Sequence, residues 1–232
     1  MRRIRCLSYC LLCLLALSSS SSLFEVGLDI YEIGHIHDDG SGQFEISADL
    51  TKMERLIKFA SFFTEISTEV AQKNIKESLA ELAKIPGNIS GISNVATTTD
   101  VNTFSAELRF QFNSVKALNE VVCKLYAFID HPGATHFKMD RHSFSRADTP
   151  NFKQVISHYR DHVKADTQIA DLILKNFLNL ITYHTTYHFD RKIKKATNKF
   201  SDVSEDRKVI FLKQSLTDAC KQEFSFSNKI FF

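Results

Sequence analysis

The chain has 232 residues, with 29 basic and 27 acidic side chains and a formal net charge of +2. Arg2, Arg3 and Arg5 lie in an N-terminal segment with the pattern of an export signal, and without them 29 − 3 = 26 basic residues face 27 acidic ones. This balance argues against nucleic acid as a partner, and a content of only three prolines and seven glycines argues against a disordered or linker-rich chain.

The first 22 residues have the three parts of a secretory signal. Three arginines precede an uncharged apolar run at residues 6–17, and serines occupy positions 18–22. The apolar run of about 12 residues is shorter than the roughly 20 that a helix needs to span a bilayer. We therefore predict a signal peptide at 1–22 and export to the periplasm or the cell exterior, with an uncleaved membrane anchor as the main alternative.

A hairpin followed by a helix is predicted next. Apolar and polar residues alternate along 24–30 and along 43–50, which is the pattern of half-buried strands. Asp38-Asp39-Gly40-Ser41-Gly42 lies between them and predicts a tight turn, because glycine readily adopts positive φ. Thr51 and Glu54 match a capping box, so a helix is expected from Thr51 to about Gln72, with a continuation over 74–84 that ends at Pro86-Gly87.

The strand–turn–strand–helix pattern then occurs a second time. Residues 92–97 and 104–112 are predicted strands around a turn at 98–102, and a helix carries apolar residues at helical spacing over 115–125. The two occurrences, around 24–84 and 91–129, share little residue identity. We interpret them as similar architecture rather than as a proven duplication.

The rest of the chain is predicted to be mostly β-structure. A small hairpin is expected across Asp140-Arg141, followed by a polar loop or insertion at about 148–165 and an amphipathic helix at 169–180. The later strands are expected at 181–189, 192–197, 208–213 and 224–232. The predicted fold class is α+β, with an antiparallel sheet built from hairpins and helices packed on one face, in a single domain over 23–232.

Histidines are the one concentrated feature with chemical potential. His35 and His37 lie two apart beside Asp38-Asp39, and His184 and His188 are expected to share one face of a strand. Imidazole and carboxylate groups are ligands of zinc and other transition metals. These four histidines are therefore weak candidates for a metal-dependent enzyme, and exposed or hydrogen-bonded histidines are the favoured interpretation.

Cys123 and Cys220 are the two cysteines that follow the predicted signal. Export would allow a disulfide between them. Two separately buried thiols are the favoured alternative, because sequence alone does not establish that their Cα atoms are close enough.

No known catalytic motif is recognised in the sequence. Gly-x-Ser-x-Gly, His-Glu-x-x-His and phosphate-binding glycine loops do not occur, and Gly40-Ser41-Gly42 fits a hairpin turn. We therefore expect a non-enzymatic protein without a cofactor. Phe59, Phe62, Phe63 and Ile66 widen the apolar stripe of the first helix beyond one face, so a carrier of an apolar small molecule or lipid is the alternative.

The chain also resembles a group of bacterial proteins. The strand, Asp39-Gly40-Ser41-Gly42 turn, strand and helix start at Thr51 resemble the beginning of uncharacterised exported proteins, mostly lipoproteins, of Bacteroidota-type bacteria. Weaker matches are Phe110-Gln111-Phe112 with Leu118-Asn119, and the segments 188–193 and 204–209.

The resemblance implies a cell-envelope protein with no assigned activity, and an unknown envelope protein or an apolar ligand as its partner. Such lipoproteins place a lipidated cysteine just before the first strand, where this chain has serines at 18–22. We therefore favour a soluble exported protein, with membrane association only where the signal is retained or lipidated.

Overall fold

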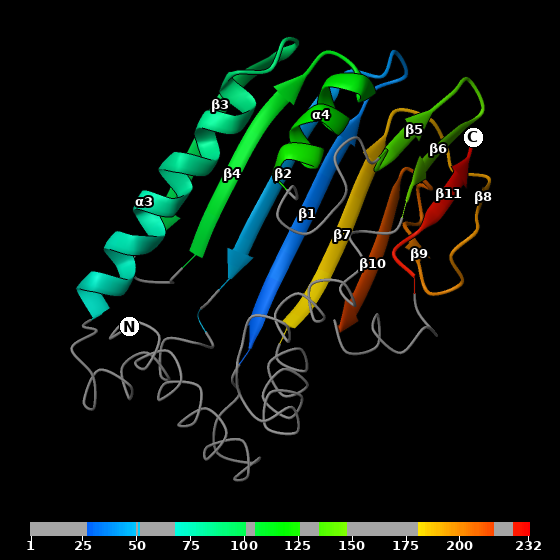
Figure 1. Cartoon of the computed structure of the whole chain (residues 1–232). Coiled ribbons are helices and arrows are strands. Elements are labelled where there is room, and N and C mark those ends of the chain that lie inside the picture. The colour runs from blue at the N-terminus through cyan, green and yellow to red at the C-terminus, as the bar shows by residue number, and fades with distance from the viewer. Residues whose placement is uncertain are drawn as a thin grey trace, which may run out of the picture.

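The structure, a computed structural model, describes residues 27–49, 51, 68–100, 105–125, 135–147, 181–215 and 225–232. The predicted signal peptide at 1–22, the polar loop at 148–165 and the helix at 169–180 lie outside the described residues. Within the described ranges, the chain forms two sheets and two helices (Figure 1).

The large sheet has seven strands, and the small sheet has four. In spatial order, the large sheet consists of β3 (Ile92–Asp100), β4 (Ser105–Phe112), β2 (Gly42–Asp49), β1 (Leu28–Ile36), β7 (Ile181–Phe189), β10 (Val209–Ser215) and β9 (Asp202–Val203). The small sheet consists of β5 (Phe137–Met139), β6 (Ser143–Arg146), β11 (Asn228–Phe231) and β8 (Lys195–Ala196). The helices are α3 (Thr68–Gly87) and α4 (Val115–Leu125). Neither of these two helices is long and apolar enough to cross a membrane.

The α+β class is confirmed, and the predicted antiparallel sheet is confirmed in part, because one of its strand pairs is parallel. β1 pairs with β2 in antiparallel fashion and with β7 in parallel fashion. The alternation of apolar and polar residues predicts that a strand is half-buried, but it does not specify which strand lies beside it or in which direction. The repeated strand–turn–strand–helix unit is not confirmed, because residues 52–67 between β2 and α3 lie outside the described ranges.

The first strand differs most from its prediction. It was expected over 24–30, whereas β1 covers Leu28–Ile36 and continues past the polar Glu32 and past Gly34. Glu32 and Gly34 interrupt the series of apolar residues at every second position. Both residues are nevertheless buried, so the alternation of buried and more exposed positions continues along the strand. The segment 181–189 is a strand over its whole predicted length, and the hairpin across Asp140-Arg141 is confirmed.

One face of the large sheet forms the core. The helix α3 lies over β3 and β4, and α4 contacts α3, β4 and β5 of the small sheet (Figure 1). The small sheet packs against β7 through aromatic side chains. The aromatic ring of Phe137 in β5 meets the edge of Phe44 in β2, with ring centroids 5.7 Å apart. Phe144 in β6 contacts Tyr187 and Phe189 of β7 at 5.5 Å and 5.4 Å between centroids. Aromatic packing therefore joins the two sheets.

The opposite face of the large sheet is polar, as the strict alternation in β4 and β7 predicts. We call it the polar face. Along each strand, the side chains of the polar face alternate with those that point into the core. The polar face includes His35, Gln43, Gln111 and His188.

Candidate functional site

A fully buried ion pair joins the core face of the large sheet to the small sheet. Glu32 in the middle of β1 is 1% exposed, and Arg146 at the end of β6 is 3% exposed. Arg146 donates from Nε and Nη2 to the two carboxylate oxygens of Glu32, each at 2.9 Å. The hydroxyls of Tyr183, at 2.7 Å, and Tyr187 donate to the same carboxylate. No sequence pattern indicated this cluster, because Glu32, Arg146 and the two tyrosines lie far apart in the chain.

Burial alone would raise the pKa of Glu32, but the charge of Arg146 and the hydrogen bonds from Arg146, Tyr187 and Tyr183 hold that pKa below its ordinary value. The pKa of Tyr187 is raised well above its ordinary value, first by burial and then by the charge of Glu32. The carboxylate therefore stays ionised and accepts four hydrogen bonds, so we interpret the cluster as a clamp between the sheets.

A row of polar side chains crosses five strands of the polar face at a single level. The strand register aligns His188 with His35, His35 with Gln43, Gln43 with Gln111, and Gln111 with Ser93. Since neighbouring strands lie about 4.8 Å apart, the row extends over roughly 19 Å. We call these five residues the cross-strand row.

Two histidines form the aromatic part of the cross-strand row. The imidazole rings of His35 and His188 stack with centroids 4.2 Å apart and an interplanar angle of 9°. Burial, followed by the nearby His37, lowers the pKa of His35. Burial and then His35 lower the pKa of His188, with Asp206 opposing them. Both rings are therefore neutral at pH 7, and each has one donor and one acceptor nitrogen.

A pocket of about 620 Å³ lies beside the cross-strand row, at the end of the sheet next to the β1–β2 turn. None of its nine lining residues is a carboxylate, a lysine or an arginine, and most offer both hydrogen-bond donors and acceptors. They are His35, His37, Ser41, Gly42, Gln43, Ser93, Gln111, Phe112 and Asn113. The Nδ2 group of Asn94 donates to Oε1 of Gln111 at 2.6 Å, which orients the Gln111 amide.

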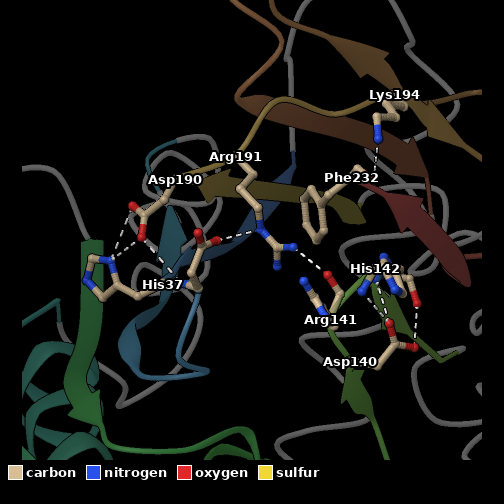
Figure 2. A network of polar contacts seen from close by, with 10 residues as sticks. His37, Asp140, Arg141, His142, Asp190, Arg191, Lys194 and Phe232 are labelled. Atoms are coloured by element: carbon tan, nitrogen blue, oxygen red, sulfur yellow. Dashed lines mark hydrogen bonds and ion pairs between the residues drawn. The ribbon is translucent and has the colours of Figure 1, made fainter.

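A second polar network, which Figure 2 shows, includes His37 from the lining of the pocket. Nδ1 of His37 lies 3.2 Å from a carboxylate oxygen of Asp190. Arg191 donates from Nε to Asp38 at 2.6 Å and from Nη1 to the carbonyl of Arg141 at 2.5 Å. The Arg191 guanidinium also lies 4.4 Å from the ring centroid of Phe232. This network holds the β1–β2 turn against the loop after β7 and the β5–β6 turn.

The four histidines predicted as metal candidates have three different sets of side-chain partners. His35 and His188 stack on each other, and His37 lies against Asp190. His184 lies on the same face of β7 as His188, and its Nε2 is 3.3 Å from a carboxylate oxygen of Asp29 in β1. In the part of the chain that the structure describes, no group of three or more His, Cys, Asp or Glu residues is arranged to hold a metal ion. The metal-dependent enzyme stays a prediction that metal analysis of the purified protein tests.

Two further predictions fall partly outside the described residues. Cys123 is half-buried on α4, but Cys220 lies outside the described ranges, so their disulfide stays a prediction. The apolar stripe with Phe59, Phe62, Phe63 and Ile66 also lies outside those ranges. The carrier of an apolar ligand therefore stays an alternative.

The sequence drew attention to His35, His37 and His188 but not to Gln43, Gln111 or Ser93. The signal that was present is the alternation itself, which places Gln43 and Gln111 on the polar faces of two predicted strands. The register between the strands, which aligns the five residues, could not be inferred from the alternation within each strand.

No protein-family model and no curated protein matches this chain. The chain is similar to the NMR structure of the folded domain of LppM from Mycobacterium tuberculosis, with a TM-score of 0.44 and 8% sequence identity, over 89% of this chain and 90% of that one.

Proposed function

We propose that this protein is an exported, non-enzymatic binding component of the cell envelope, and that the pocket on the polar face holds an uncharged, hydrogen-bonding ligand. The observation that carries this proposal is the cross-strand row beside the pocket. Its side chains are two amides, a hydroxyl and two neutral imidazoles in register. Such groups bind a ligand by matching donors with acceptors, and they discriminate against ions because no opposite charge compensates for desolvation.

The envelope location rests on the sequence. The signal-like segment at 1–22 supports export, and the Asp-Gly-Ser-Gly hairpin supports the resemblance to exported envelope proteins of Bacteroidota-type bacteria. Cell fractionation with mass spectrometry of the mature N-terminus tests it. We expect a soluble exported form that begins near residue 19 or 23, and recovery of the unprocessed chain from the cytoplasm would contradict the proposal.

The binding site is tested with a ligand-observed NMR screen of the purified mature protein against uncharged polar, anionic, cationic and apolar compounds. We expect uncharged polar compounds to bind. Gln43→Ala and Gln111→Ala should each weaken that binding at least tenfold, because each variant removes a donor and an acceptor from the pocket. Ser47→Ala is the matched control, because Ser47 lies on the same strand and face as Gln43, two pleats away. Hits confined to charged or apolar compounds, or equal losses in Ser47→Ala, would overturn the assignment.

A further inference from the structure

We infer that the ligand of this pocket is a neutral saccharide, an inference that rests on the proposed function. The hydrogen-bonding groups of the pocket make the first argument. A sugar hydroxyl both donates and accepts, and so do the amides of Gln43, Gln111 and Asn113, the neutral imidazole of His35 and the hydroxyl of Ser93. These groups lie about 4.8 Å apart from strand to strand. They therefore offer several hydrogen-bond donors and acceptors to a sugar ring that carries hydroxyls on neighbouring carbons.

The second argument is the aromatic wall of the pocket. His35 lines the pocket and His188 does not, although the two rings stack almost in parallel. His188 therefore covers one face of the His35 ring, and the other face is directed toward β2 and the pocket, because β1 lies between β7 and β2. A flat aromatic face next to amide groups suits a sugar ring, whose C–H side is apolar and whose rim is polar.

The third argument compares the saccharide with other uncharged ligands. An extended peptide binds a sheet by pairing with the backbone of an edge strand. Of the strands that line the pocket, β1, β2 and β4 are each paired on both sides, so their backbone groups are already used. β3, which contributes Ser93, ends the sheet, and its open side points away from β4 and therefore away from Gln43 and Gln111. A purely apolar ligand would contact mainly Phe112, whose side chain is 3% exposed and belongs to the core. Recognition at this place therefore depends on side chains that bind hydroxyl groups.

The experiment is isothermal titration of the mature protein with neutral tetrasaccharides of glucose, of mannose and of N-acetylglucosamine. An uncharged dipeptide, N-acetyl-alanyl-alanine amide, serves as the non-saccharide probe. We expect at least one tetrasaccharide to bind, and we expect Gln43→Ala and the equal-sized Gln111→Glu to weaken that binding at least tenfold. Ser47→Ala should change it less than twofold. Thermal unfolding of each variant shows whether it is folded.

The outcomes separate this inference from the proposed function. If the dipeptide or other uncharged compounds bind through Gln43 and Gln111 while none of the tetrasaccharides does, the saccharide inference is overturned and the binding function stands. If no uncharged compound of any kind binds, both fail. Saccharide binding that Ser47→Ala weakens as much as Gln43→Ala places the sugar elsewhere and also overturns the inference.

Discussion

Glu32 is a single carboxylate among the buried side chains of β1, and its surroundings explain why it is tolerated there. Arg146 and two tyrosine hydroxyls satisfy both of its oxygens. Gly34 contributes to this arrangement, because a Cβ at this position would lie 2.8 Å from the ring of Tyr187. A buried ion pair of this kind gives little net stability over an apolar pair, but loss of one partner leaves a charge that nothing compensates.

This cluster leads to the first prediction. Glu32→Gln and Arg146→Met should each lower the free energy of unfolding by about 3–5 kcal/mol, because each leaves the opposite charge buried without its partner. The double variant should recover much of that loss, since the amide oxygen of Gln still accepts from one tyrosine and its NH2 group donates to the hydroxyl oxygen of the other. Urea denaturation of the three variants measures the coupling.

The exposed pair of Glu120 and Lys124, 3.0 Å apart, is the matched control for that prediction. Lys124→Ala should cost at most about 1 kcal/mol, because solvent screens an exposed ion pair. If the losses in Glu32→Gln and Arg146→Met simply add in the double variant, the clamp interpretation is wrong.

At the scale of elements, one side chain joins α4 to the small sheet. Oδ1 of Asn119 accepts from the backbone N–H groups of His136 and Phe137 at 2.9 and 2.8 Å. Its Nδ2 group donates to the carbonyl of Phe137 at 2.7 Å. Asn119 thus serves as a hydrogen-bonding partner for the edge of β5, where the short strand begins.

The second prediction follows from this contact. Asn119→Ala should lower the free energy of unfolding by about 1–3 kcal/mol, because the partly buried backbone groups of His136 and Phe137 lose their hydrogen-bonding partner. Amide hydrogen exchange at Phe137 should speed up more than exchange in β7. Glu120→Ala, on the exposed side of the same helix, should have a small effect in both measurements. Equal effects of the two substitutions would show that Asn119 does not anchor β5.

At the scale of the whole molecule, the stability should depend on pH through the paired histidines. The pKa values of His35 and His188 are lowered in the folded protein from an ordinary value of 6.5, mainly by burial. Well above pH 6.5 both folded and unfolded states hold these rings neutral, so the histidines add no pH dependence there. As the pH falls below 6.5, the unfolded chain takes up protons first, and the free energy of unfolding decreases.

The third prediction is that this decrease is smaller in a His35→Asn/His188→Asn variant. Urea denaturation at intervals between pH 8 and pH 5 measures it, with the wild-type protein as reference. The pKa of Glu32 is lowered from 4.5, so its contribution is present above pH 4.5 and is lost only at lower pH. An unchanged slope below pH 6.5 in the double variant would show that the stacked imidazoles do not carry the effect.

The sequence by itself determined most of the local structure that the described residues test. Alternation predicted the strand at 104–112, the strand at 181–189 was also predicted, and the Asp-Gly-Ser-Gly turn predicted the first hairpin. These features depend on side-chain period and turn chemistry, which neighbouring residues specify. The sequence also placed His184 and His188 on one face of β7, as the structure confirms.

The tertiary structure decided which of these residues meet. The parallel pairing of β1 with β7 brings His35 onto His188, and it leaves His184 beside Asp29 instead of in one group with the other histidines. The same pairing places Glu32 beside Tyr183 and Tyr187, so that Arg146 closes the cluster from the small sheet. Register and partner choice between strands distant in sequence arise from the packing of the whole core, and the period of a single strand does not contain them.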